Sequence, residues 1–367
     1  MGIFNKKRVL VTGHTGFKGT WLCEWLLSLG AEVVGLALDP PTEPSLFNQI
    51  GLGGRLQDIR GDIRDSEGVK KTVLEIAPDF IFHLAAQPLV RESYQKPVET
   101  YETNVMGTVH VLEALRAYEG SCVAIMITTD KCYENREWMH GYREEDPLGG
   151  YDPYSSSKAA AEIVVAAYRR SFFKEGKKAV ASARAGNVIG PGDWAKDRIV
   201  PDCVRALQQK EVVQVRNPHA TRPWQHVLEP LGGYLSLAAH LSDSLSKGDH
   251  AKLSGLASAF NFGPNAESNR PVRCLVEEIL HHWPGQWKDT SDPRSVHEAS
   301  LLHLTIDKAR HLLGWHPAWN FQETIQKTAE GYQVLYRETA QEACRQMVLG
   351  QIREYQQKSN LVFREDG

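Results

Sequence analysis

Short apolar runs alternate with longer amphipathic segments through the first half of the chain. The apolar runs read as buried strands at residues 9–12, 33–38, 80–85, 123–128 and 179–184. Between them, apolar residues recur at helical spacing and predict helices at residues 18–29, 66–76, 98–118 and 154–174. This alternation is typical of a Rossmann-like α/β fold, in which a doubly wound parallel sheet carries helices on both faces.

The pattern changes halfway along the chain. Proline, glycine, tryptophan and charged residues cluster there, strands become sparse, and helical segments dominate to the end. We therefore predict a Rossmann domain at residues 1–186 and a smaller, mostly helical substrate domain at residues 187–222 and 266–367, over the carboxyl edge of the sheet. Residues 223–265 are expected to return to the first domain, with one more strand near residues 260–264.

Composition narrows the class of protein. The net charge is −3, from 42 basic and 45 acidic residues, so no basic surplus favours a nucleic-acid or membrane-surface partner. We find no signal peptide and no apolar stretch long enough to span a membrane. The six cysteines are scattered without a CxxC pair, which favours reduced thiols in a cytoplasmic protein and argues against zinc or any other metal site.

A glycine-rich turn follows the first predicted strand and opens the first predicted helix. Glycines in a GxxGxxG spacing at such a turn let the backbone approach a pyrophosphate, which then rests on the helix N-terminus. The spacing alone is a weak signal, and its position between strand and helix strengthens it. The cofactor contacts expected from this turn are Gly13, Thr15, Gly16, Phe17, Lys18 and Gly19.

Asp39 lies at the end of the second predicted strand. A carboxylate there suits the ribose hydroxyls and repels a 2′-phosphate, which favours NAD over NADP. The alternative is a plain turn residue before two prolines. Later strand ends are expected to line the same cofactor, although they could equally be ordinary strand ends: Asp62, Ile63, Leu84, Ala85, Ala86 and Gln87.

Tyr154 and Lys158 stand four residues apart, on one side of a predicted helix. An ammonium near a phenol stabilises the phenolate and lowers the tyrosine pKa, so the tyrosine becomes a usable base. A strand end with two threonines, an aspartate and a lysine, residues 128–131, precedes this pair.

Together these motifs resemble the extended short-chain dehydrogenase/reductases, and the resemblance covers nearly the whole chain. It includes the TNVMGT run with Asn104, which the resemblance places at the cofactor, the segment at residues 184–191, and TRPWQHV. Within the family, the TDK run with Tyr154 and Lys158 is similar to the sugar-nucleotide 4,6-dehydratases. GHTGFKG, LDPPTEPSLF and TTDKCYEN are similar to the members that act on CDP-glucose, which open the routes to CDP-linked 3,6-dideoxyhexoses of lipopolysaccharide O-antigens.

The resemblance implies a reaction in three steps. Tyr154 would remove the proton of the sugar carbon-4 hydroxyl as hydride passes to NAD, Thr129 would hydrogen-bond that oxygen, and Lys158 would hold the phenolate and the ribose. Lys131, as a neutral amine, or a neighbour that it activates, would take the carbon-5 proton. Asp130, kept protonated, would donate to the departing carbon-6 hydroxyl, and the hydride would return to carbon 6. Most hexose dehydratases carry Asp-Glu here, and a plain salt bridge between Asp130 and Lys131 is the alternative.

The resemblance also implies a diphosphate site made of Asn187, Arg222 and Arg294, with Arg198 as a further candidate on the nucleotide side. Arginine forks suit phosphate oxygens. The alternative is that these arginines are solvated surface residues.

Family members pair two long helices with their symmetry mates, so a homodimer or a higher homo-oligomer is expected. Each predicted helix carries an apolar stripe: Val105, Val109, Leu112 and Leu115 in one, and Ala160, Ile163, Val164 and Ala167 in the other. Three other functions stay open: a dehydratase of dTDP-, GDP- or UDP-linked sugars, a 4-epimerase or decarboxylating enzyme of the same fold, and a cofactor-sensing regulator. The retained Tyr154 and Lys158 argue against the regulator.

Overall fold

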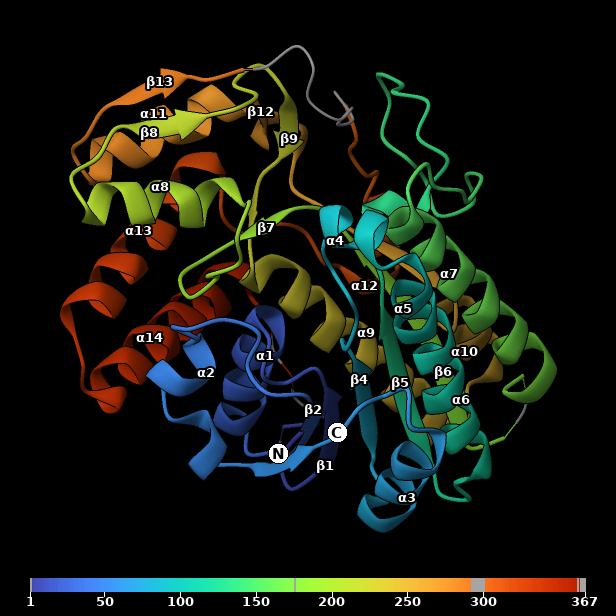
Figure 1. The fold of residues 1–367 in the computed structure, drawn as a ribbon. Coiled ribbons are helices and arrows are strands. Elements are labelled where there is room, and N and C mark those ends of the chain that lie inside the picture. The colour runs from blue at the N-terminus through green and yellow to red at the C-terminus, as the bar shows by residue number, and fades with distance from the viewer. Residues whose placement is uncertain (1, 175, 292–300, 362, 364–367) are drawn as a thin grey trace.

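The computed structural model describes residues 2–174, 176–291, 301–361 and 363. Its centre is a seven-stranded parallel sheet in the order β11-β6-β5-β4-β1-β2-β3 (Figure 1). The chain order of the strands reverses between β1 and β4, and doubly wound sheets bind ligands at such a point. The strands are β1 (Arg8–Thr12), β2 (Glu32–Ala37), β3 (Gln57–Arg60), β4 (Phe80–His83), β5 (Cys122–Ile127), β6 (Lys178–Ala185) and β11 (Ala259–Phe262).

Alternating side chains of these strands fill two separate cores. In β1, Val9 and Val11 pack into the core beneath α1 (Phe17–Ser28) and α9 (Leu228–Lys247), while Leu10 packs into the opposite core. That second core lies beneath α3 (Ser66–Ile76), α6 (Gly107–Ala117) and α7 (Pro153–Phe172). The predicted Rossmann-like fold is confirmed, including the late strand, which is β11 and pairs with β6.

The long helix predicted at residues 98–118 is not continuous, so that prediction is wrong in detail. It consists of α5 (Pro97–Tyr101), a π-helical turn (Glu102–Met106) and α6. Single π-turns within helices are found mostly at functional sites, because the extra residue turns side chains out of the regular helical register. Asn104 lies in this turn.

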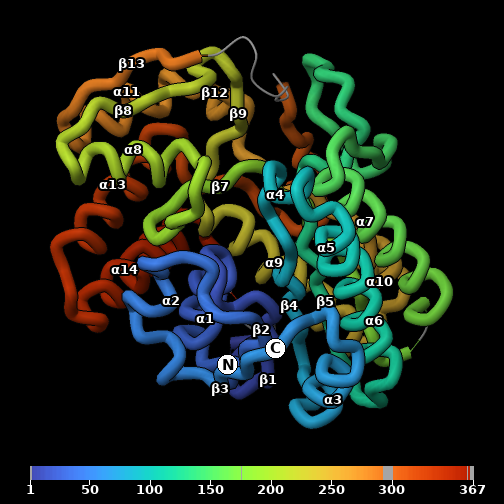
Figure 2. Tube along the Cα trace, in the orientation of Figure 1, coloured from blue at the N-terminus to red at the C-terminus, as the bar shows by residue number. Residues whose placement is uncertain are grey.

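The remaining elements form a second lobe and a few connectors. In Figures 1 and 2 the lobe gathers α8, α11 and α13 around the short strands β8 and β13, beyond the carboxyl ends of the central strands. Its elements are β7 (Val188–Ile189), α8 (Ile199–Gln208), β8 (Val213–Val215), β9 (Thr221–Pro223), β10 (Gln225–His226), β12 (Asn269–Pro271), α11 (Val272–His282), β13 (Trp287–Asp289) and α13 (Phe321–Arg337). The last helix, α14 (Gln341–Ser359), packs against α13 and also against α1 and α2.

Short helices complete the described chain: α2 (Leu46–Gln49), α4 (Val90–Gln95), α10 (His250–Leu256) and α12 (Asp307–Leu313), with 3-10 turns at Leu52–Gly54, Asp130–Cys132 and Ala266–Ser268. Within the described ranges, no helix combines the length and apolar character needed to cross a bilayer.

Candidate active site

The glycine turn is shaped for a pyrophosphate. Gly13 has a φ of +77°, and a Cβ there would lie 2.8 Å from the backbone nitrogen of Ala85. A Cβ on Gly19 would lie 2.1 Å from the carbonyl oxygen of Gly13, so turn and helix touch without side chains between them. Gly16 begins α1 with no side-chain cap and no acidic residue in the first turn, which leaves its N–H groups for an anion. The residues therefore fit a dinucleotide.

Two other residues of the turn are occupied by the protein itself. Thr15 donates its hydroxyl to the carbonyl oxygen of Leu38 at 3.0 Å and ties the turn to the end of β2. The imidazole of His14 is buried, and its Nε2 lies 2.8 Å from Oδ1 of Asp58. His14 thus supports the turn from behind and does not face the site.

The expected cofactor-selecting residue has a cationic neighbour that the sequence analysis missed. Asp39 follows β2, its side chain is 92% exposed, and its Oδ1 lies 3.8 Å from Nε of Arg60. Arg60 also donates to the carbonyl oxygen of Leu38 at 2.9 Å, which fixes its guanidinium beside Asp39. A carboxylate and an arginine thus lie together where the adenosine ribose of a dinucleotide is expected.

The residues predicted to line the cofactor come from two segments, residues 62–63 after β3 and residues 84–87 after β4. Arg64 donates to Asp62 at 2.9 Å, so this carboxylate is held at the surface after β3. Ile63 is buried, and a Cβ on Gly107 would lie 2.5 Å from its Cδ1. The segment after β4, residues 84–87, is partly buried and lies directly against the glycine turn.

Asn104 connects this segment to the catalytic helix. Its Oδ1 accepts from the backbone N–H of Gln87 at 2.9 Å, and its Nδ2 donates to the carbonyl oxygen of Gln87 at 3.1 Å and to Oγ of Ser157 at 2.9 Å. Ser157 in turn donates to the carbonyl oxygen of Tyr154 at 2.7 Å. The amide group of Asn104 is therefore engaged by protein groups, and the π-helical turn gives it this position.

His83 extends the same network to the glycine turn, and sequence reasoning missed it. The Thr108 hydroxyl donates to the carbonyl oxygen of Asn104 at 2.8 Å, so it accepts from the His83 ring, and Nδ1 on the other side of the ring accepts from the Thr12 hydroxyl at 2.8 Å. Nε2 of His83 then donates to Oγ1 of Thr108 at 3.3 Å. Burial lowers the pKa of His83 to about 3, so the ring is neutral and the direction of these bonds is fixed. A polar last residue in an apolar strand was the available signal.

The catalytic candidates from β5 and α7 meet at the carboxyl edge of the sheet. Asp152 caps α7 by accepting from the backbone N–H of Ser155 at 2.9 Å, which places Tyr154 in the first helical turn. Tyr154 is buried beside Thr129. Thr129 donates its one hydroxyl proton to Oδ1 of Asp130 at 2.9 Å, so the phenol, the hydroxyl and the carboxyl lie in one group.

Burial governs the protonation of this group. It raises the pKa of Tyr154 to about 12, although the nearby Thr129 hydroxyl opposes the shift, so the expected lowering of the tyrosine pKa is wrong for this structure. Burial also raises the pKa of Asp130, with Lys131 as the largest opposing influence, and this favours a protonated acid. For Lys158, burial lowers the pKa to about 8, and Glu162 opposes.

A buried ion pair lies beneath Lys158. Nη2 of Arg184 is 2.8 Å from Oε2 of Glu162, and both side chains are almost fully buried. Thr128 and Ser182 also donate to the Glu162 carboxylate, which keeps it ionised and lowers its pKa against the effect of burial. The carboxylate one helical turn below Lys158 therefore holds a fixed negative charge that favours the ammonium form.

Lys18 reaches into the site from the glycine turn. Its ammonium lies 5.9 Å from the ring centre of Tyr234, whose buried hydroxyl has no hydrogen-bond partner among the described residues. Burial lowers the pKa of Lys18 to about 8, Arg198 lowers it further, and Asp130 raises it. Phe17, next to it, faces the second lobe, since a Cβ on Gly190 would lie 3.2 Å from its ring.

Two of the four predicted substrate-binding residues, Arg198 and Arg222, lie near the catalytic candidates Tyr154 and Asp130. Arg198 caps α8, lies 2.7 Å from Oδ2 of Asp193, and is close enough to Tyr154 to affect its charge balance. Arg222, on β9, lowers the pKa of Asp130 through its charge. Asn187 lies in the partly buried loop between β6 and β7. Arg294 lies outside the described residues.

Comparison with known proteins agrees with this arrangement. The family profile described as GDP-mannose 4,6 dehydratase matches residues 10–328. The chain therefore belongs to this family of extended short-chain dehydrogenase/reductases, as the sequence predicted.

Relatives narrow the class further. The chain is 47% identical over 337 residues to the CDP-glucose 4,6-dehydratase of Salmonella typhimurium, covering 90% of this chain and 92% of that protein. It is 31% identical over 346 residues to the CDP-paratose 2-epimerase of Salmonella typhi, covering 87% of this chain and 97% of that protein.

Solved structures share the fold at lower identity. A UDP-glucose 4-epimerase from Thermotoga maritima, solved with UDP-glucose, aligns with a TM-score of 0.75 at 20% identity and covers 90% of this chain and 100% of its own. A dTDP-glucose 4,6-dehydratase from Bacillus anthracis, in complex with NAD, aligns with a TM-score of 0.71 at 22% identity, covering 89% and 96%.

Proposed function

We propose that this protein is a CDP-glucose 4,6-dehydratase that uses NAD and releases CDP-4-keto-6-deoxyglucose and water. The observation that carries the proposal is the buried Asp130 with a raised pKa, hydrogen-bonded to Thr129 beside Tyr154. An epimerase needs the oxidising tyrosine and lysine alone, whereas a dehydratase also needs an acid for the departing hydroxyl. The 47% identity to a CDP-glucose 4,6-dehydratase supports the nucleotide.

The residues divide the reaction between oxidation at carbon 4 and elimination across carbons 5 and 6 of the sugar. Tyr154 takes the proton of the carbon-4 hydroxyl, Thr129 hydrogen-bonds the same oxygen, and Lys158 stabilises the phenolate. NAD, when bound in the glycine turn, supplies the hydride acceptor and donor. Lys131 takes the carbon-5 proton that the 4-ketone has acidified, and Asp130 donates its proton to the carbon-6 hydroxyl, which leaves as water.

The substrate is held by its diphosphate. Arg198 and Arg222 lie on the side of the site formed by the second lobe, and Asn187 lies in the loop that passes Asp130. A Cβ on Gly186 would lie only 2.8 Å from Oδ2 of Asp130, so this loop closes over the carboxyl group. Two arginine forks are well suited to the phosphate oxygens of a nucleotide sugar.

A product assay tests the proposal. The protein is incubated with CDP-, UDP-, dTDP- and GDP-glucose, and the alkaline absorbance of a 4-keto-6-deoxy sugar is followed. The proposal expects this product from CDP-glucose at the highest kcat/KM. A 4-epimerised product, or a higher kcat/KM with another nucleotide, would contradict it.

Asp39→Ala should lower the preference for NAD over NADP by about tenfold or more, because like charges at close range cost several kcal/mol. Arg60 remains beside the ribose and can then meet a 2′-phosphate. Dissociation constants for both dinucleotides by calorimetry measure the ratio. Adding Arg60→Ala should remove the gain in NADP binding. An unchanged ratio in Asp39→Ala would show that Asp39 does not face the ribose.

A homodimer is the assembly that we propose. The expected apolar seam needs one correction: Leu112 and Leu115 are buried against the chain's own sheet. Exposed apolar side chains instead come from α5, the π-helical turn and α7, with Val98 at 70%, Met106 at 46% and Ile163 at 59% exposure. Sedimentation should show a dimer at micromolar concentration and a monomer for Ile163→Glu. A monomeric unmodified protein would overturn this assembly.

The cellular location that fits this function is the cytoplasm. All six cysteines are free thiols, which suits a reducing compartment.

A further inference from the structure

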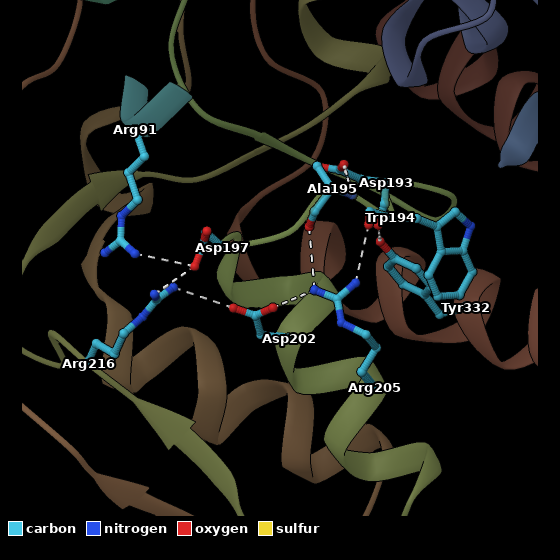
Figure 3. Close-up of polar contacts among 9 residues, drawn as sticks. All are labelled: Arg91, Asp193, Trp194, Ala195, Asp197, Asp202, Arg205, Arg216 and Tyr332. Carbon is cyan, nitrogen blue, oxygen red and sulfur yellow. Dashed lines mark hydrogen bonds and ion pairs between the residues drawn. The ribbon is translucent and has the colours of Figure 1, made fainter. Parts of the chain in front are cut away.

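Five charged side chains of alternating sign form a ladder from α4 to α8 (Figure 3). Arg91 lies 3.4 Å from Asp197, Asp197 lies 2.8 Å from Arg216, and Arg216 lies 3.6 Å from Asp202, which Arg205 pairs from the other side. These side chains are between 34% and 56% exposed, so a ligand can reach them. Exposed pairs of this kind add little stability, which leaves room for another role.

The ladder continues the diphosphate site along α8. Arg198 is the N-cap residue of this helix and lies near Tyr154, and Asp202 lies in the first turn of the same helix. Arg216 comes from the end of β8, the strand that packs on α8. Carbon 1 of a hexose lies across the ring from carbon 4. A substrate with carbon 4 at Tyr154 and its diphosphate on Arg198 therefore points its nucleoside toward Asp202 and Arg216.

The loop that leads into α8 is held in place. Arg205 donates to the carbonyl oxygen of Trp194 at 3.2 Å, Tyr332 donates to that of Asp193, and the Trp194 and Tyr332 rings meet edge to face at 5.2 Å (Figure 3). The same Arg205 orients Asp202 through Oδ1. The carboxylate is thus fixed before any ligand arrives, as selective recognition requires.

We propose that Asp202 and Arg216 read the cytosine base of the substrate, an inference that rests on the proposed function. The polar edge of cytosine carries an N4 amino donor followed by the acceptors N3 and O2. A carboxylate accepts from N4, and a guanidinium donates to acceptors. Uracil and thymine present an acceptor and an N–H donor in the first two places. The acceptor would then meet the carboxylate of Asp202, and the N–H donor would meet the guanidinium of Arg216, so neither contact would be a hydrogen bond.

The hydrogen bonds favour Asp202 over Asp197 as the reader. Oδ1 of Asp202 is engaged by Arg205, whereas its Oδ2 is 3.6 Å from Arg216, beyond ordinary hydrogen-bond distance, and can accept from an amino group. Asp197 is bonded to Arg216 at 2.8 Å and also approaches Arg91. Asp197 therefore holds Arg216 in place and does not read the base.

The test compares CDP-glucose with UDP-glucose. Asp202→Asn should lower kcat/KM for CDP-glucose by about ten- to a hundredfold, mainly through KM, because one well-matched base contact is worth about that much discrimination. UDP-glucose should change less than about threefold. Asp197→Asn, which loosens Arg216, should lower kcat/KM for CDP-glucose by less than Asp202→Asn does and should also leave UDP-glucose within about threefold. Asp243→Asn is the matched control: its carboxylate is also about one-third exposed and paired along a helix, with Lys247, and it should change neither.

Binding of CDP and UDP by calorimetry gives a second readout that does not depend on catalysis. Asp202→Asn and Arg216→Gln should each weaken CDP binding and leave UDP binding nearly unchanged. If both nucleotides weaken equally, the ladder only shapes the loop and the base assignment is wrong. If the unmodified protein forms no 4-keto product from CDP-glucose, the proposed function itself fails, which the same assays show separately.

Discussion

Tyr154→Phe should lower kcat for CDP-glucose by about a thousandfold, and almost no NADH absorbance should appear when substrate is added. The change removes only the phenol oxygen beside Thr129, which as the phenolate must accept the carbon-4 proton as hydride passes to NAD. Because the side chain is buried and nearly isosteric with phenylalanine, the fold should persist. Stopped-flow absorbance under single-turnover conditions measures the oxidation directly.

Tyr151→Phe is the matched control for this variant. Tyr151 lies three residues earlier, just before the cap of α7, and is 91% exposed. Its loss of a hydroxyl should leave kcat within about twofold, as expected for a surface position. A Tyr154→Phe protein that still reduces NAD at the original rate would remove Tyr154 from the oxidation step.

Most of the central fold follows from the sequence because its strands are short, apolar and buried on both faces; the polar edge strand β3 is the exception. In β1 the alternation of Val9 and Leu10 between two cores is fixed by strand geometry alone. The break in the helix at residues 98–118 does not follow from local sequence. It depends on the contacts that Asn104 makes with Gln87 and Ser157, which are distant in the chain.

The sequence predicts which residue types make up the candidate site, but it predicts their pKa values only in part. The spacing of Tyr154 and Lys158 indicates that they share a helix face, and both side chains are buried in the structure. The sign of the Tyr154 pKa shift was wrong because desolvation depends on how completely the site closes, which spacing does not reveal. The roles of His83 and Arg60 were missed because their hydrogen-bond and ion-pair partners come from other strands, which local sequence does not reveal.

The structure also supplies a second lysine for the elimination step. Lys131 influences the pKa of Asp130 more than any other charged side chain does, so it lies close to the acid. Lys18 reaches the same carboxyl group from the glycine turn, and burial lowers its pKa to about 8, which makes part of it a neutral amine near pH 8. We propose that one of these two amines takes the carbon-5 proton, and we assign that role to Lys131 because it follows the acid directly in the chain.

Lys131→Met should therefore stop the reaction after oxidation. Adding CDP-glucose should still produce NADH, because Tyr154 and Thr129 are intact, and the 340-nm absorbance should persist while product formation falls about a hundredfold or more. Lys18→Met, measured at saturating NAD, should turn over without accumulating NADH. If Lys18→Met traps NADH and Lys131→Met does not, the base is Lys18. If Lys131→Met forms no NADH at all, Lys131 belongs to the oxidation step. The proposed separation of oxidation at carbon 4 from elimination across carbons 5 and 6 is then wrong.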